Sequence, residues 1–312
     1  MKKKRQSTLV PELDEVNKRR NKENKDPRSN KKESKYDPRN TLNNLTGKEW
    51  IQETTSIWYQ KGLGKNHSET KYERMHPAPF SFTNVKRLIL FFTKEGQTVL
   101  DPFSGVSSTL KAAALCNRNG IGIELTKKWV KISKERLKKE ITPLDTDSKQ
   151  TIIQGDAFER LDDLETNSID FVVTSPPYYN ILKKKADHKV REERLKNNLA
   201  TDYSEDPRDL GNYKDYNEFL ERLTEILVKC QRVLKLKKYM CVIVSDFRNK
   251  RDFTPFHSDI YSLLLGKSDF SLEGIIILVQ GAKKLYPYGY PFAYVENIHH
   301  QYILVFQNLK RK

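Results

Sequence analysis

The sequence predicts an α/β fold with a doubly wound, mainly parallel sheet. From about residue 76 onward, short apolar runs alternate with longer stretches in which apolar residues recur at helical spacing. Alternation of strands and helices is typical of a parallel sheet with helices on both faces. A chain of 312 residues can bury one substantial core of this kind plus appendages, so one main domain is expected.

Seven strands and five helices account for the pattern. The strands are expected at residues 98–100, 120–124, 151–154, 171–174, 239–245, 274–280 and 301–306. The helices are expected at residues 85–92, 107–115, 127–140, 216–234 and 258–265. The last two strands are expected to pair with each other and to close the sheet.

The composition divides the chain into three parts. Residues 1–40 are rich in charged residues and asparagine and poor in large apolar groups, which predicts a disordered basic tail. Non-specific binding of phosphates by this tail is the alternative. Residues 41–75 are expected to form a helical segment that packs on the core, and residues 76–312 the main domain with a polar insert at 180–212. The apolar residues that suggest this packing are Trp50, Ile51, Ile57 and Trp58.

The charge favours a polyanionic partner. Lys and Arg number 57 against 41 Asp and Glu, for a formal net charge of +16. Nucleic acid is favoured over a membrane because no long apolar segment exists. The basic start lacks the apolar region of a secretory signal, and the cysteines show no paired spacing, so a reduced cytoplasmic protein is expected. The histidines lack metal-ligand spacing, so no metal is expected.

A strand-like run at residues 169–174 is followed by Ser175, Pro176, Pro177 and Tyr178. The residue before a proline is held extended, and the prolines have no N–H that competes for acceptors. The Ser175 hydroxyl and the Pro176 carbonyl are therefore placed to accept the two hydrogens of an exocyclic amino group. Tyr178 offers a ring face on which a base can stack. An ordinary proline-rich turn after a buried strand is the alternative.

Three more strand ends carry groups that suit a nucleotide-like ligand. Residues 101–105, Asp-Pro-Phe-Ser-Gly, form a small-residue turn between a strand and a helix, where backbone N–H groups meet such ligands. Glu124 ends the next strand roughly twenty residues later, as suits an acid that accepts both ribose hydroxyls. Asp156 follows the strand after that, where it is placed to bind an adenine amino group. Each feature is common by itself, but four in order at strand ends indicate a ligand site.

Residues 101–105 together with residues 174–178, Thr-Ser-Pro-Pro-Tyr, resemble the S-adenosylmethionine-dependent DNA amino-methyltransferases. This family methylates N6 of adenine or N4 of cytosine. The resemblance covers residues 42–310 and includes the segments at 46–50 and 76–80. It implies a Rossmann-like methyltransferase fold with one antiparallel strand near the sheet edge, and S-adenosyl-L-methionine as the cofactor.

The resemblance also implies roles for residues of this chain. The residues implied to bind the cofactor are Asp101, Pro102, Phe103, Gly105, Glu124, Asp156 and Ala157. Those implied to form the catalytic turn are Ser175, Pro176, Pro177 and Tyr178. One departure is Ser107, which stands where the family usually has a second glycine. A serine fits this position if its φ stays negative.

The implied reaction is direct transfer of a methyl group to the amine of a flipped base, without a metal and without a covalent intermediate. No cysteine follows a proline, which excludes the Pro-Cys nucleophile of the cytosine C5-methyltransferases. Ser175 at the first position of the turn favours cytosine N4, with adenine N6 as the alternative. Methylation of RNA or of a protein amide is less favoured, as is a DNA-binding subunit without catalysis.

Two basic segments are expected to contact DNA. Lys183, Lys184 and Lys185 follow the catalytic turn directly, where they could reach phosphates. The loop before the last strand interleaves lysines with tyrosines, which suits phosphate and base contacts. Packing of this loop on the core is the alternative. The contact residues expected in the loop are Lys283, Lys284 and Tyr288. The expected partners are double-stranded DNA and a cognate restriction endonuclease.

Overall fold

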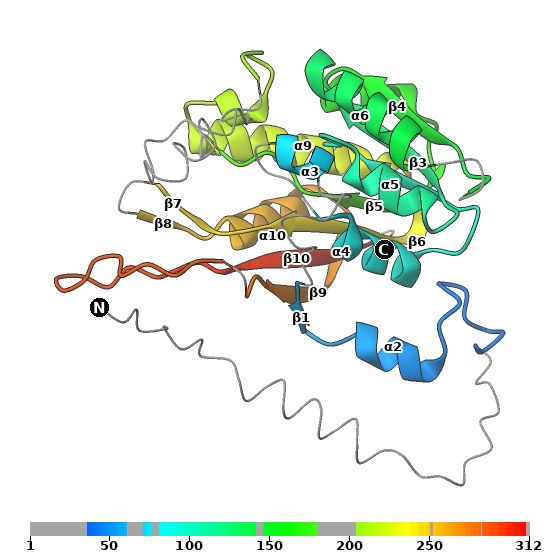
Figure 1. Cartoon of the computed structure of the whole chain (residues 1–312), viewed down its shortest axis with the longest axis horizontal. Coiled ribbons are helices and arrows are strands. Elements are labelled where there is room, and N and C mark those ends of the chain that lie inside the picture. The colour runs from blue at the N-terminus through cyan, green and yellow to red at the C-terminus, as the bar shows by residue number, and fades with distance from the viewer. Residues whose placement is uncertain are drawn as a thin grey trace, which may run out of the picture.

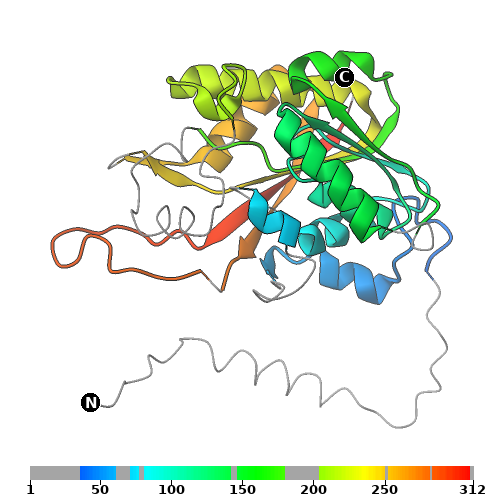
Figure 2. The same ribbon diagram turned by 45° about the horizontal axis from the view of Figure 1, so that its top comes forward.

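A single large sheet forms the centre of the molecule, and helices cover both of its faces (Figures 1 and 2). The computed structural model describes residues 36–60, 71–76, 81–141, 146–179, 204–249, 252–281 and 283–309. The expected α/β class and the mainly parallel, doubly wound sheet are confirmed. The expected number of seven strands is wrong, because an eighth strand is added at one edge of the sheet.

The strand order across the sheet is β1-β9-β10-β6-β5-β2-β3-β4. The strands are β1 (Ile57–Tyr59), β2 (Thr98–Asp101), β3 (Asn119–Glu124), β4 (Gln150–Gln154), β5 (Ile169–Thr174), β6 (Leu234–Val244), β9 (Phe270–Val279) and β10 (His300–Asn308). β10 runs antiparallel to both of its neighbours and the other pairs are parallel, so the expected antiparallel strand is confirmed. A short hairpin of β7 (Phe247–Asn249) and β8 (Asp252–Thr254) forms a second sheet.

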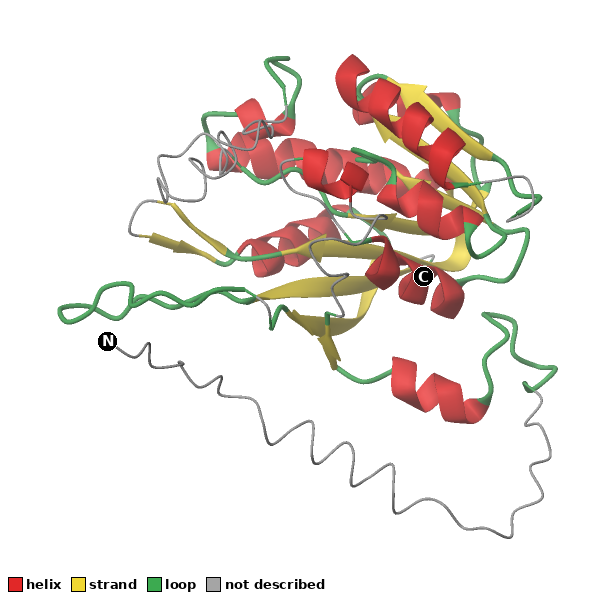
Figure 3. Cartoon of the chain, viewed as in Figure 1, coloured by secondary structure: helices red, strands yellow, loops and turns green. Residues whose placement is uncertain are grey.

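Figure 3 separates the helices from the strands by colour. The α-helices are α2 (Gly47–Glu53), α3 (Lys71–Met75), α4 (Phe82–Phe92), α5 (Ser108–Ala114), α6 (Lys127–Glu140), α7 (Ala157–Arg160), α9 (Tyr216–Val233) and α10 (Phe256–Lys267). Two 3-10 turns are η2 (Leu161–Asp163) and η3 (Leu210–Asn212). Within the described residues, none of these helices has the length and apolar character needed to cross a membrane.

The sheet has a core on each face because side chains alternate along its buried strands. In β5, Val172 packs with α9 and α10, whereas Phe171 and Val173 face the opposite side and pack with α4 and α5. Strands buried on both faces read as continuous apolar runs, and this explains why β5 was predicted correctly. The three cysteines are free and buried, as the sequence predicts.

The eighth strand lies in the segment that was expected to be helical. Ile57 and Tyr59 are exposed, whereas Trp58 is 2% exposed and packs in the core. This period of two is that of a strand, and β1 pairs in parallel with β9. The Arg87 guanidinium lies 3.5 Å from the centre of the Trp58 ring. Only α2 and α3 are helical among the described residues of this segment.

Candidate active site

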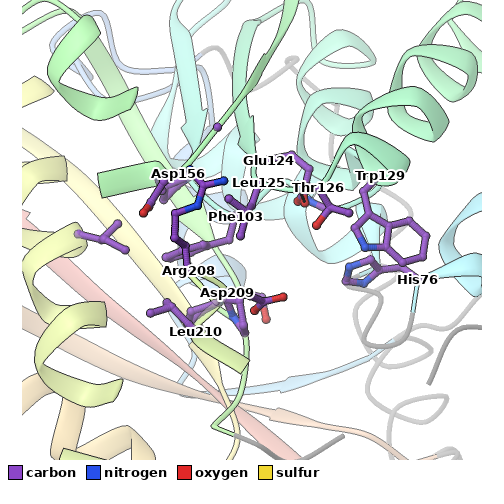
Figure 4. Close-up of a pocket in the computed structure, with 18 of the residues that line it drawn as sticks. His76, Phe103, Glu124, Leu125, Thr126, Trp129, Asp156, Arg208, Asp209 and Leu210 are labelled. Carbon is purple, nitrogen blue, oxygen red and sulfur yellow. Dashed lines mark hydrogen bonds between the residues drawn. The ribbon is translucent and has the colours of Figure 1, made fainter. Parts of the chain in front are cut away.

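Both sequence motifs line one cleft at the carboxyl ends of the parallel strands. Figure 4 is a close-up of this cleft and labels Phe103 of the first motif. The space between its lining atoms, including the open mouth, is about 690 Å³. Most of the predicted site residues line it. They are Pro102, Phe103, Gly105, Glu124, Asp156, Ala157, Ser175, Pro176, Pro177 and Tyr178.

Asp101 supports the cleft from beneath and is not among its lining residues. Its carboxylate accepts hydrogen bonds from Thr109 Oγ1 at 2.5 Å, Thr174 Oγ1 at 2.7 Å and the Phe103 N–H at 3.0 Å. Burial raises the pKa of Asp101, although these three hydrogen bonds act in the opposite direction. The carboxylate thus joins the loop after β2 to the end of β5, and its role is to hold both motifs in place.

Two residues of the loop after β2 adopt left-handed backbone conformations. Gly105 has a φ of 50°, and a Cβ added there would lie 3.2 Å from His76 Nε2. Ser107 is fully buried and has a φ of 61°. A serine was expected to fit here only with a negative φ, and this requirement is not met. The Ser107 N–H donates to the Ser104 carbonyl at 2.8 Å, which closes the turn before α5. This position therefore favours glycine, although the chain carries serine.

Glu124 is fixed at the end of β3 by two backbone donors. Its Oε2 accepts from the Gly105 N–H at 2.9 Å, and its Oε1 accepts from the Thr126 N–H at 2.8 Å. Burial raises the pKa of Glu124 to about 7 in spite of these bonds. The Thr126 side chain also hydrogen-bonds this carboxylate. A carboxylate offers about four lone-pair sites, so with three donors in place Glu124 can accept one further hydrogen bond from a ligand.

Asp156 caps α7 at the end of β4. Its Oδ1 accepts from the Phe158 N–H at 2.9 Å, and its Oδ2 lies 3.6 Å from Arg222 Nη2. The Arg222 guanidinium also stacks 3.5 Å from the centre of the Phe158 ring. Asp156 is 8% exposed and lines the cleft together with the neighbouring Ala157.

The turn after β5 brings a tyrosine ring into the cleft. The Tyr178 ring packs against Phe256, with 5.9 Å between ring centroids. Its hydroxyl lies 3.5 Å from Gln301 Nε2, at the start of β10. Burial raises the pKa of Tyr178 to about 12, so the phenol stays neutral around neutral pH. The ring is held by contacts on two different elements.

Several lining residues were missed by the sequence reasoning. Arg208, Asp209 and Leu210 come from the described end of the polar insert, where low apolar content gave no signal. They lie across the cleft from His76 and Trp129 in the view of Figure 4. His76 packs edge-on against Trp129 with 5.0 Å between ring centroids. His76 belongs to the segment at 76–80 that carried part of the resemblance, whereas no pattern indicated Trp129.

A buried ionic network fixes α3 and therefore the position of His76. The Arg136 side chain has no exposed surface. Its Nη2 lies 3.2 Å from Glu73 Oε1, and its Nε lies 2.9 Å from Glu140 Oε2. Lys111 Nζ lies 2.9 Å from the same Glu140 oxygen. Arg136 Nη1 also donates to the Val106 carbonyl at 2.9 Å, within the loop after β2. One arginine thus links α3 and α6 to that loop.

The residues expected to contact DNA lie outside this cleft or outside the described residues. Lys183, Lys184 and Lys185 lie outside the described residues. The other three, Lys283, Lys284 and Tyr288, are exposed in the segment that joins β9 to β10. This segment, residues 283–299, is called the arm below. It projects from the body of the protein in Figures 1 and 2.

Comparisons with known proteins place these features in a family. The chain matches the N6_N4_Mtase family, described as DNA methylase, over residues 2–135 and 169–312. It is 38% identical over 86 residues to the orphan methyltransferase M.BamHII of Bacillus amyloliquefaciens, covering 28% of this chain and 32% of that protein. It is 35% identical over 96 residues to the type II methyltransferase M.BglI of Bacillus subtilis, covering 30% and 26%. The chain spans about a third or less of both curated relatives.

A solved structure of a DNA modification methylase from Thermus thermophilus, in complex with S-adenosyl-L-methionine, shows a partial likeness. It is 23% identical, with a TM-score of 0.34, and the match covers 51% of this chain and 55% of that one.

Proposed function

The chain belongs to the N6/N4 DNA methylase family, whose cofactor is S-adenosyl-L-methionine, and we propose that it methylates an exocyclic amine of a base in double-stranded DNA. One observation supports this proposal above the others. The loop after β2 and the turn after β5 line a single cleft, although they are far apart in the sequence. A cofactor held by the first motif and a base held by the second would meet there.

The cleft suits the cofactor on chemical grounds. Glu124 has acceptor capacity left for a ribose hydroxyl, and Gly105 lets the backbone approach closely because it has no Cβ. Phe103 and Asp156 both line the cleft, where Phe103 would offer an apolar face and Asp156 would accept a hydrogen bond from an adenine amino group. When bound, S-adenosyl-L-methionine supplies an electrophilic methyl group on its sulfonium.

The turn after β5 would position the attacking nitrogen. A base must leave the stack to reach the cleft, since a paired amine is inaccessible within the duplex. Tyr178 would stack on the flipped base, while the Ser175 hydroxyl and the Pro176 carbonyl accept its amino hydrogens. These bonds direct the nitrogen lone pair toward the methyl carbon. The N–C bond forms as the C–S bond breaks, and one amine proton leaves to water, so no strong base is needed.

Cytosine N4 is the base position that we favour. The turn begins with serine, and this feature resembles the cytosine-N4 members more than the adenine-N6 members. Adenine N6 is the alternative. Lys283, Lys284 and Tyr288, with Lys183, Lys184 and Lys185, are proposed to contact the duplex. The net charge of +16 supports a DNA partner. A cognate restriction endonuclease and a cytoplasmic location remain part of the proposal.

Mass spectrometry of nucleosides tests the reaction. Plasmid DNA is incubated with the protein and methyl-labelled S-adenosyl-L-methionine, and the digested nucleosides are analysed. Label in N4-methylcytosine is the expected result, and label in N6-methyladenine would change the base but not the mechanism. If cofactor binds but no label enters DNA, the proposed substrate is wrong, and RNA and protein amides become the substrates to test.

A DNA-binding subunit without catalysis is distinguished by a cofactor titration. The left-handed Ser107 raises this alternative, because strain in the loop could weaken cofactor binding. Saturable binding followed by calorimetry supports the enzyme. DNA binding without saturable cofactor binding would support the non-catalytic subunit instead.

A further inference from the structure

The tip of the arm exposes three large aromatic side chains. Tyr290 is 81% exposed, Phe292 is 93% exposed and Tyr294 is 86% exposed. Aromatic rings bury more surface than almost any other side chain when they find a partner. A cluster of them at the end of a projecting segment is therefore typical of a contact surface. Figure 1 shows the arm extending well beyond the neighbouring strands.

Hydrogen bonds within the arm give its tip a defined shape. The N–H groups of Phe292 and Ala293 both donate to the Gly289 carbonyl, at 2.7 and 2.8 Å. Gly289 has a φ of 75°, which a residue with a side chain rarely adopts. Nearer the body, the Asn297 side chain accepts from the Tyr286 N–H at 2.9 Å and donates to the Tyr286 carbonyl at 2.7 Å. The aromatic rings are thus presented on a pre-organised turn, which lowers the entropy cost of binding.

The arm leaves the sheet at the carboxyl ends of the parallel strands, which is also where the cleft lies. β9 and β6 are both antiparallel to β10, and β6 is parallel to β5, so the carboxyl end of β9 points the same way as that of β5. The residues that flank the arm contact each other, and one of them contacts Tyr178 in the turn after β5. Gln280 Nε2 donates to Gln301 Oε1 at 3.3 Å, and Gln301 lies 3.5 Å from the Tyr178 hydroxyl.

We propose that the aromatic tip inserts into the base stack of duplex DNA beside the target base, with Phe292 as the inserting ring. This proposal rests on the proposed function, because it assigns the arm to the same DNA substrate. Lys283 and Lys284 are exposed at the start of the arm, where they suit phosphates on either side of an opened base step. A ring that enters the stack replaces part of the stacking that is lost when a base is flipped.

Duplex DNA is favoured over a second copy of this chain as the occupant. The net charge of +16 opposes the association of two copies of this chain and favours a polyanionic partner. A polyanion that also offers flat rings satisfies both the lysines and the aromatic tip.

Two variants of Phe292 test the insertion. Phe292→Ala removes the ring, and Phe292→Tyr keeps it. Phe292→Ala is expected to lower methyl transfer to duplex plasmid on the order of tenfold to a hundredfold, without a change in cofactor affinity. Phe292→Tyr is expected to retain most of the activity. Leu236→Ala is the matched control, since Leu236 is also exposed but lies at the opposite end of the sheet, and it should behave as wild type.

Unwinding of DNA provides a readout that does not depend on methyl transfer. Closed circular plasmid is relaxed by a topoisomerase with saturating protein bound, and its linking number is measured. Wild type and Phe292→Tyr are expected to lower the linking number, and Phe292→Ala to lose most of this effect. Insertion is overturned if wild type does not unwind DNA, or if Phe292→Ala unwinds and methylates as well as wild type.

Sedimentation velocity tests the competing occupant. A wild-type dimer that Phe292→Ala converts to a monomer would assign the tip to a second copy and overturn insertion. A failure of the proposed function looks different, because wild type would then transfer no methyl group while it still unwinds DNA in a Phe292-dependent way.

Discussion

The Thr174 hydroxyl donates a hydrogen bond of 2.7 Å to Asp101 Oδ1, although the two residues are 73 positions apart. Thr174 is the last residue of β5, and Asp101 is the last residue of β2. Thr174 is 1% exposed and Asp101 is 5% exposed, so the bond lies in the interior. It ties the turn proposed to hold the base to the loop proposed to hold the cofactor.

Removal of this hydroxyl is expected to destabilise the protein. Thr174→Val keeps the side-chain shape but leaves a buried carboxylate oxygen without one of its donors. The expected loss in the free energy of unfolding is about 1–3 kcal/mol. Urea unfolding followed by circular dichroism measures it, with Thr151→Val in β4 as the control. A loss no larger than that of the control would show that the bond contributes little.

The pKa of Glu124 predicts a pH dependence of cofactor affinity. Because its pKa is about 7 and ribose hydroxyls bind the anion best, affinity should rise as the pH rises through neutrality. The expected change is up to about tenfold per pH unit below the pKa, with a plateau above it. Calorimetric titrations at several pH values measure this slope. Glu124→Gln should bind more weakly and show no such slope, and a slope that survives in this variant would point to another group.

Replacement of the left-handed serine is expected to stabilise the loop. Ser107→Gly removes the Cβ that disfavours a φ of 61°, and the gain is partly offset by the greater freedom of glycine in the unfolded chain. The expected net gain is about 0.5–1 kcal/mol, with tighter cofactor binding. Ser107→Ala is the matched control, because it removes the hydroxyl but keeps the Cβ. Equal stability of the two variants would exclude backbone strain as the cause.

The network around Arg136 is expected to be essential for stability. Arg136→Met would remove the positive charge that neutralises the largely buried carboxylates of Glu73 and Glu140. The expected loss in the free energy of unfolding is about 3–5 kcal/mol. Lys139→Met on the same helix is the control, since the Lys139–Glu135 pair is largely exposed and should contribute less than about 1 kcal/mol. Comparable losses in the two variants would contradict a special role for the buried pair.

The ring of Tyr178 should matter for methyl transfer far more than for cofactor binding. Tyr178→Ala removes the proposed stacking face, so transfer should fall on the order of tenfold or more. Tyr178→Phe keeps the ring and loses the hydroxyl with its contacts to Gln301, the Ser245 backbone and the Ser175 side chain, so its turnover should stay much closer to wild type than that of the alanine variant. Turnover with labelled cofactor and cofactor titration separate the two effects. Normal turnover of the alanine variant would remove the stacking role.

Local sequence patterns predicted most strands and helices because side-chain periodicity reports burial directly. In α9, the buried residues Phe219, Leu223, Leu227 and Cys230 repeat at helical spacing, and Asp215 caps the helix by accepting from two backbone N–H groups. β1 was missed because three residues around Trp58 are too few to establish a period. Arg208, Asp209 and Leu210 were missed because a polar segment looks the same whether it lines a cleft or faces solvent.

By itself, the sequence determined the class of fold, the chemical groups at the ends of the strands and the family that they indicate. Each of these depends on neighbours along the chain, where the spacing of apolar residues and the chemistry of turns act locally. Only the tertiary structure decided that Asp101 meets Thr174, that Ser107 is left-handed and that the arm leaves the sheet beside Tyr178. These relationships depend on strand order and on contacts between distant segments, and the packing of the whole sheet selects them.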